Sequence, residues 1–221
     1  MSHDLHESLR DNVRILGDSL GRTIADDLGP GFVDRIETIR GFAKRGRQGE
    51  DGSQRALIEY LRKLPDRDLL PVTRAFNQFL NLANIAEQHY RARFRRVEDY
   101  RPGSQPVLSE LLERARGEGH SPRKLVETLS GMRVELVLTA HPTEVIRRTL
   151  IQKYDAIDDC LTAIESSGDY PERGARAQGR LEELISQAWH TDEIRHERPT
   201  PVDEAKWGFA VIENSLWQAV P

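Results

Sequence analysis

The sequence is poor in cysteine, and Cys160 is the single one among its 221 residues. One cysteine cannot form a disulfide within the chain, and it cannot supply a metal site made of several thiolates. This composition fits the reducing cytoplasm, so we expect a cytoplasmic protein. The residues around Cys160 follow a helical pattern, and we expect its thiol to be buried and inert.

Long apolar runs are also missing. No stretch approaches the ~20 consecutive apolar residues that a membrane helix needs, and the polar N-terminal residues are unlike a signal peptide. The two signs of charge are nearly balanced, with 32 Lys and Arg against 36 Asp and Glu and a formal net charge of -4. We therefore expect neither a membrane nor nucleic acid as a partner, and any anion site must be local.

Most of the chain has apolar residues at the period of an amphipathic helix. We expect helices at about residues 5–28, 32–43, 57–64, 66 into the nineties, 107–116, 122–130, 144–167, 172–194 and 203–217, with a polar, glycine-rich loop at 44–52. The fourth of these helices has little polar face between Leu80 and Ala86, which predicts burial on most of its circumference. Its asparagines, Asn77, Asn81 and Asn84, have poor helix propensity, which indicates specific partners, but an ordinary polar seam between packed helices is the favoured alternative.

One stretch departs from the helical pattern. Residues 134–140, Val-Glu-Leu-Val-Leu-Thr-Ala, are a short β-branched and aliphatic run that predicts a buried strand. Pro142 ends this strand, because proline lacks an N–H donor and holds the preceding His141 in an extended conformation. Thr143 can cap the helix that follows. The expected order is strand, histidine and helix N-terminus.

This order of elements has chemical consequences. A helix N-terminus offers free N–H groups and about half a positive charge, and Arg147 and Arg148 in the opening turns add to a field that suits phosphate or carboxylate. A histidine at the C-terminal end of a parallel strand is where α/β barrels place catalytic groups, which makes His141 a candidate catalytic residue. On chemistry alone an alternative stays open, namely a structural histidine that caps a turn beside arginines on a solvated face.

A single strand cannot form a sheet. A buried strand needs neighbours that pair its backbone N–H and C=O groups, and no other run in the sequence is comparable. We therefore expect a mainly α chain that is the opening part of a larger protein. Its predicted divisions are a helical region at 1–132 and the strand with the following helices at 133–221.

Two further groups of histidines are candidates for metal or catalytic sites. His190 and Glu193 would share a helix face, but His196 points elsewhere, so a metal site on one helix is poorly formed. Ion pairing and helix termination are the preferred explanation there, and we predict no metal ligands in the chain. The other histidines, which lie among polar neighbours or near helix ends, are expected to be structural: His3, His6, His89 and His120.

Four segments of the sequence resemble, in order, the phosphoenolpyruvate carboxylase family. Residues 137–144, Val-Leu-Thr-Ala-His-Pro-Thr-Glu, followed by the arginine pair at 147–148, are similar to the first active-site signature of that family. Residues 70–87, 189–195 and 199–217 agree with the family in the same order. The resemblance spans nearly the whole chain and is to the bacterial branch.

The resemblance implies an allosteric homotetramer whose subunit is a TIM-type α/β barrel decorated with helices, with residues 134–140 as the first barrel strand. It implies Mg²⁺ or Mn²⁺ as cofactor, and an anaplerotic reaction that carboxylates phosphoenolpyruvate with bicarbonate to oxaloacetate and phosphate. Bicarbonate attacks the phosphoryl group to give carboxyphosphate and an enolate, which captures the released CO₂. The resemblance gives His141 a catalytic role at carboxyphosphate, and it suggests that Arg147 and Arg148 bind a phosphorylated activator.

The resemblance also implies that much of the active site lies outside this sequence. In the family the metal-binding carboxylates, a second catalytic histidine and the substrate-binding arginines lie downstream. We therefore expect residues 1–221 to be an N-terminal fragment that is inactive alone. One alternative is a non-catalytic helical interaction module that docks onto full-length subunits. Another is a phosphate-ester lyase or phosphatase built around His141, which would lack a metal cage.

Overall fold

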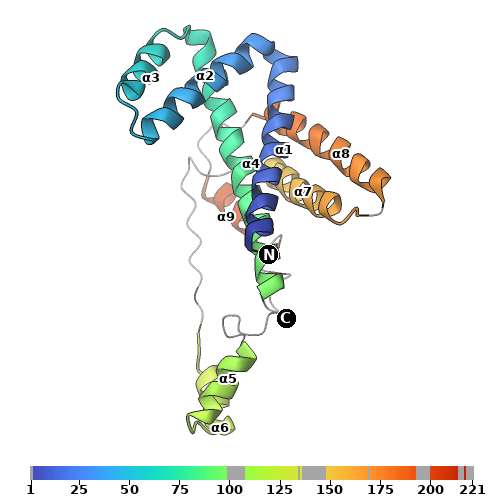
Figure 1. Ribbon diagram of the computed structural model, residues 1–221. Helices are drawn as coiled ribbons and strands as arrows, with labels where there is room; N and C mark the ends of the chain where they lie inside the picture. Colours follow the sequence, from blue (N-terminus) through green and yellow to red (C-terminus); the bar gives the residue numbers. More distant parts are fainter. Residues whose placement is uncertain are drawn as a thin grey trace. The chain divides into compact units, whose positions relative to one another are not determined.

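The computed structural model describes residues 2–98, 108–133, 135, 148–168, 170–192, 200–213 and 217. Its helices are α1 (Ser2–Leu28), α2 (Pro30–Arg47), α3 (Ser53–Arg62), α4 (Asp66–Glu98), α5 (Leu108–Gly117), α6 (Pro122–Ser130), α7 (Arg148–Glu165), α8 (Pro171–Trp189) and α9 (Pro201–Val211) (Figure 1). Within the described residues there is no strand, and the expectation of a mainly α chain is confirmed. The predicted strand at 134–140 lies outside them, apart from Glu135.

By its internal contacts the chain divides into two compact units, each made of separated segments. The first consists of Met1–Tyr90 and Ile146–His196, and the second of Arg91–Val145 and Glu197–Pro221. The first unit therefore contains α1, α2, α3, α7, α8 and most of α4. The predicted division between residues 132 and 133 follows the order of the sequence and stays a prediction.

The first unit is a helical assembly around one hydrophobic core. Helix α1 packs against α2 and α8, and α7 and α8 form an antiparallel pair joined by a short turn (Figure 1). The core is made of aliphatic side chains with exposed fractions near zero, which come from α1, α4, α7 and α8: Leu16, Leu82, Ala86, Ile157, Leu161, Leu181 and Ile185. Segments far apart in the sequence thus share one interior.

Trp189, the last residue of α8, fixes this helix to α1. Its indole is 2% exposed, and its Nε1–H donates a hydrogen bond to Asp27 Oδ2 at 2.8 Å. The Arg74 guanidinium of α4 lies over the same ring, 5.8 Å from its centroid. Burial of a large aromatic ring together with a satisfied indole N–H makes this a strong contact.

Two helices of the second unit have capped N-termini. Ser121 caps α6 by accepting a hydrogen bond from the Lys124 backbone N–H at 3.2 Å. Thr200 and Asp203 form a reciprocal capping box at the start of α9. Apolar side chains are exposed on α6, where Val126 is 63% exposed.

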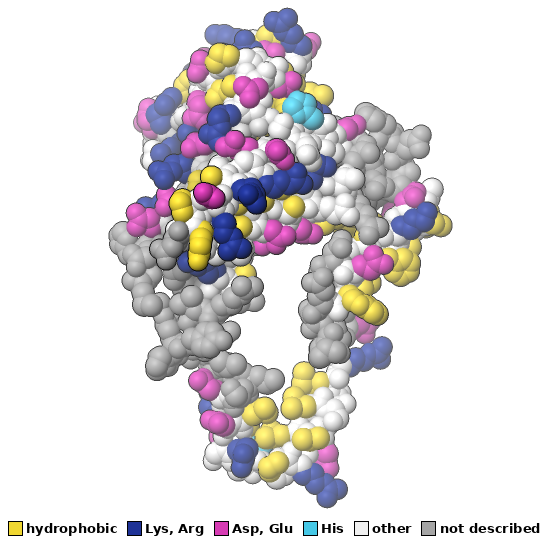
Figure 2. Space-filling model, turned by 90° about the vertical axis from the view of Figure 1, so that its right-hand side faces the viewer, with side chains coloured by type: hydrophobic (Ala, Val, Ile, Leu, Met, Phe, Trp, Pro, Cys, Tyr) yellow, Lys and Arg dark blue, Asp and Glu magenta, His cyan; other side chains and the backbone are white. Residues whose placement is uncertain are grey.

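Basic and acidic side chains are mixed over the face drawn in Figure 2, in keeping with the nearly balanced charge of the sequence. The described helices include none that is long and apolar enough to cross a membrane.

Three local predictions were wrong. Residues 44–47, predicted as loop, continue α2 to Arg47, because basic side chains in a last turn interact favourably with the helix dipole. Helix α8 ends at Trp189 and not near residue 194, since the Thr191 hydroxyl donates to the Gln187 carbonyl at 2.6 Å and competes with helix continuation. Helix α4 is buried along one side only, and Leu80 is 59% exposed.

Candidate functional site

The structure places the predicted site residues only in part. His141 and Arg147 lie outside the described residues, and Arg148 is described as the first residue of α7 without its side chain. Their predicted roles therefore stay predictions. What the structure does describe is α7, the helix that continues directly from the signature, and the contacts that hold it.

Helix α7 is held by its apolar face. Leu150 is 1% exposed, and Ile157 and Leu161 are fully buried in the core of the first unit. Burying side chains of this size contributes roughly 1.5–3 kcal/mol each. Because Leu150 lies three residues after Arg147, the chain that leaves the signature is anchored within one helical turn of the arginine pair.

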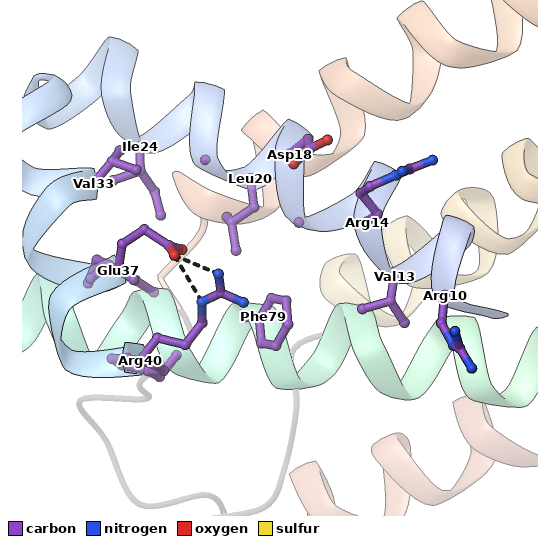
Figure 3. Close-up of a pocket in the computed structure, with 15 residues that line it drawn as sticks. Arg10, Val13, Arg14, Asp18, Leu20, Ile24, Val33, Glu37, Arg40 and Phe79 are labelled. Carbon is purple, nitrogen blue, oxygen red and sulfur yellow. Dashed lines mark hydrogen bonds and ion pairs between the residues drawn. The ribbon is translucent and has the colours of Figure 1, made fainter. Parts of the chain in front are cut away.

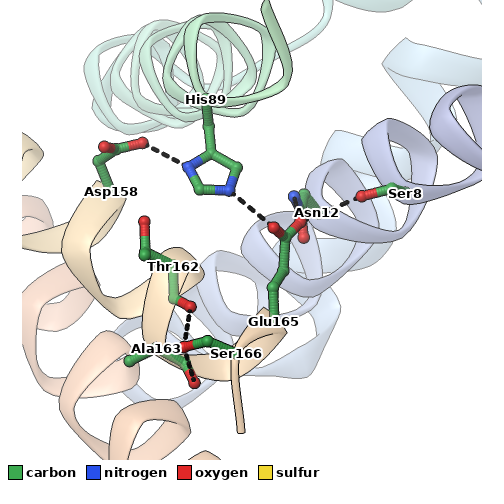
Figure 4. Close-up of polar contacts among 8 residues, drawn as sticks. All are labelled: Ser8, Asn12, His89, Asp158, Thr162, Ala163, Glu165 and Ser166. Carbon is green, nitrogen blue, oxygen red and sulfur yellow. Dashed lines mark hydrogen bonds and ion pairs between the residues drawn. The ribbon is translucent and has the colours of Figure 1, made fainter. Parts of the chain in front are cut away.

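A buried polar junction fixes the other end of α7. His89 of α4 is 8% exposed, and its Nδ1 lies 2.8 Å from Asp158 Oδ1 while its Nε2 lies 3.1 Å from Glu165 Oε2. The second oxygen of Glu165 accepts hydrogen bonds from Ser8 Oγ at 3.1 Å and Asn12 Nδ2 at 3.0 Å, both on α1. Figure 4 shows the imidazole between the two carboxylates. Three helices thus meet at one set of hydrogen bonds.

The geometry defines what His89 does chemically. An imidazole donates two hydrogen bonds only when both ring nitrogens carry a proton, and each nitrogen here faces a carboxylate oxygen. The ring therefore bridges the two carboxylates, and Glu165 is in turn held by α1. Such a group is costly to leave unpaired and strongly orients its neighbours when it is paired.

A second, uncharged junction lies about one turn before Asp158 along α7. The Tyr154 hydroxyl accepts a hydrogen bond from Asn81 Nδ2 at 3.2 Å and donates to Gln78 Oε1 at 3.4 Å. Gln78 is 2% exposed, so this contact also lies in the interior. The predicted partner of Asn81 is therefore found, as part of a polar seam between α4 and α7.

Sequence reasoning placed His89 among structural histidines and missed its partners. A usable signal was present, because His89 follows Leu82 and Ala86 at helical spacing and so falls on the buried stripe of α4. The two carboxylates are 69 and 76 positions away in the sequence, and only the fold brings them to the ring.

Two groups on α7 have altered acidity. Burial, followed by the charges of Asp159 and Asp158, raises the pKa of the Asp155 carboxyl. Burial also raises the pKa of the Cys160 thiol, against a lowering effect of Arg180. The thiolate is the reactive form of cysteine, so the buried Cys160 is an inert core group, as the sequence predicted.

The His, Cys, Asp and Glu side chains are the candidates for a metal site. Within the part of the chain that the structure describes, no three His, Cys, Asp or Glu side chains come together to hold a metal ion. Asp158, His89 and Glu165 instead hydrogen-bond to one another and to α1.

The first unit also contains a cavity of about 360 Å³ between α1, α2 and α4 (Figure 3). Apolar side chains such as Leu20, Ile24 and Phe79 line it together with five charged ones, and two of these, Glu37 and Arg40 of α2, form an ion pair at its edge. No pattern in the sequence predicted this cavity.

Known proteins similar to this chain support one family. The chain is 84% identical over 221 residues to a phosphoenolpyruvate carboxylase of Chromohalobacter salexigens, and the match covers 100% of this chain and 25% of that protein. It is 56% identical over 218 residues to a phosphoenolpyruvate carboxylase of Pseudomonas aeruginosa, which covers 99% of this chain and 25% of the relative. The chain thus spans a quarter of the length of these relatives and corresponds to their N-terminal part.

A sequence model of the same family, described as phosphoenolpyruvate carboxylase, matches residues 9–221. This range contains all four segments on which the resemblance was based, together with α7 and every residue of its two polar junctions except Ser8. On these findings the chain belongs to the phosphoenolpyruvate carboxylase family.

Proposed function

We propose that this chain forms part of an enzyme that carboxylates phosphoenolpyruvate with bicarbonate to give oxaloacetate and phosphate. The observation that carries the proposal is the match of residues 9–221 to the family, with the signature at 137–148 inside it. The reaction serves anaplerotic carbon fixation into the tricarboxylic acid cycle. Because the chain spans a quarter of its relatives, residues 1–221 contribute to the active site and do not complete it.

His141 is the proposed catalytic residue. In the sequence it ends the predicted strand at 134–140 and precedes the helix that becomes α7, which is anchored from Leu150 onward. From this position a neutral imidazole takes up the proton of carboxyphosphate and steadies that intermediate before CO₂ leaves. Arg147 and Arg148 supply the cationic surroundings for a phosphate group, of the substrate or of a phosphorylated activator.

The remaining features of the enzyme are proposed from the family. Mg²⁺ or Mn²⁺ would neutralise the charge that develops on oxygen during the reaction. The family resemblance implies metal-binding carboxylates downstream of this sequence, so we propose that its oxygen ligands belong to other parts of the full-length protein. We propose a barrel subunit assembled as a cytoplasmic, allosteric homotetramer.

The proposal is tested by replacing His141 with Asn in the full-length protein. We expect oxaloacetate formation to fall by at least about 10²-fold, the usual scale for removing a general acid or base, with secondary structure unchanged. Oxaloacetate is measured by reduction with malate dehydrogenase and NADH, and folding by circular dichroism. His120→Asn is the matched control, since His120 is an exposed histidine that lies outside the signature.

Carboxylation at the wild-type rate by His141→Asn would reject the catalytic assignment. Residues 1–221 alone are expected to form no oxaloacetate, and activity of this piece by itself would show that the active site is complete within it. Recovery of the piece in complex with full-length subunits, again without activity, would favour the interaction module.

A further inference from the structure

The cavity in the first unit exists because side chains are missing from one face of α1. Gly17 and Gly21 lie one turn apart on that face, inside a helix that runs from Ser2 to Leu28. A Cβ at Gly17 would touch the Phe79 ring at 3.4 Å, whereas a Cβ at Gly21 would meet nothing within 4 Å. The space beside Gly21 is therefore open directly next to the backbone of α1.

The size and the walls of this cavity fit an apolar group. Its volume of about 360 Å³ exceeds twice the ~150 Å³ of an engineered apolar cavity that binds benzene. Side chains of three helices line it, with Leu20 and Ile24 on α1, Val33 on α2 and Phe79 on α4. An aromatic ring with a short chain is of the right size.

One guanidinium reaches this apolar space. Figure 3 shows Arg40 pointing toward Leu20 and Phe79, whereas Arg10 and Arg14 point away at the far end. Arg40 donates from both Nε and Nη2 to the same Glu37 oxygen, Oε2, at 3.0 and 2.6 Å. No hydrogen bond of Nη1 is found among the described residues, so the edge of the guanidinium that includes Nη1 can donate to a second carboxylate in the planar two-bond geometry.

The ion pair itself does not close the cavity. Arg40 and Glu37 are 59% and 53% exposed, and pairs this exposed are only weakly held. Of the other charged side chains that line the cavity, Arg10 and Arg14 point away from it, and Arg14 pairs with Asp11, so the charge at this edge is that of Arg40 and Glu37. The Nη1 side of Arg40 is the group here that can receive an anion.

We propose that this cavity binds a small organic carboxylate with an apolar body. The body lies beside Gly21 between Leu20 and Phe79, and the carboxylate accepts hydrogen bonds from the free edge of Arg40. This binding site is separate from the proposed chemistry of His141 and does not depend on it.

The test uses 3-phenylpropanoate as the probe and the full-length protein that contains this chain. Saturation-transfer NMR detects weak binding to a large protein and gives a Kd by titration. 3-Phenylpropan-1-ol is the neutral comparison, since it has the same body without the charge. We expect the acid to bind saturably, and about tenfold more tightly than the alcohol, because only the acid can use Arg40.

Variants locate the binding. Gly21→Leu fills the open space and should abolish saturable binding of both compounds, while Gly21→Ala should weaken binding a few-fold with the fold retained. Arg40→Gln should remove the tenfold advantage of the acid and leave the alcohol unchanged. Arg55→Gln is the matched control, because Arg55 is an exposed arginine that pairs with Glu59 outside the cavity.

Three results would overturn the proposal. One is the absence of saturable binding by the acid up to about 10 mM, a concentration at which even a millimolar site would fill. Another is undiminished binding to both Gly21 variants, which would place the compound elsewhere. The third is equal binding of acid and alcohol, which would remove the role of Arg40.

Discussion

The two sides of α1 are built differently. The side toward α7 and α8 is held by packing and hydrogen bonds, with Asn12 bonded to Glu165 and Asp27 to the buried indole of Trp189. A hollow of about 520 Å³ also lies between α1 and α8, and polar side chains line it. The side toward α2 and α4 carries two glycines and a cavity of about 360 Å³. The first side holds α7, the helix that follows the His141 signature. The second side contains unfilled space, and filling it would make the protein more stable.

The largest expected loss of stability follows from a change on the side of α1 that faces α8. Trp189→Ala removes a fully buried ring, an indole hydrogen bond and the contact with Arg74, and it should lower the free energy of unfolding by about 3–5 kcal/mol. Urea unfolding of residues 1–221, followed by far-ultraviolet circular dichroism, measures the change. Trp217→Ala is the control, because Trp217 is 78% exposed and should change stability by less than about 0.5 kcal/mol. Equal losses in the two variants would contradict the difference in burial.

The second effect concerns the junction that joins α1 and α4 to α7. His89→Leu leaves Asp158 and Glu165 without their shared donor and should cost about 2 kcal/mol, less than the loss of the tryptophan. His120→Leu, at an exposed histidine, should be nearly neutral. Hydrogen exchange is the sharper measurement, since faster exchange should appear at the C-terminal end of α7. Unchanged protection there would mean that the apolar face alone holds the helix.

These comparisons also show what could be predicted from the sequence. Helical spacing located α1, α3 and α6 because each has one apolar stripe with turn or cap residues at its ends. The sequence did not predict that α4 is exposed at Leu80, because apolar residues also occur on the exposed side of a helix.

Contacts between distant segments were harder to predict than the helices themselves. The partners of His89 depend on how α4 and α7 pack, and the sequence holds no local signal for that arrangement. The cavity was missed for a related reason. It is formed by side chains that Gly17 and Gly21 do not have, and glycine in a helical pattern says nothing of what lies opposite.

The smallest expected change in stability lies on the side of α1 toward α2 and α4, and it is a gain. Gly21→Ala adds a Cβ that meets nothing within 4 Å, and alanine is favoured over glycine inside a helix by roughly 0.5–1 kcal/mol. The variant should therefore be more stable than the wild type by about this amount in urea unfolding. Gly17→Ala is the matched comparison and should gain less, because its Cβ would touch the Phe79 ring at 3.4 Å. A loss of stability in Gly21→Ala would mean that the space beside Gly21 is already filled.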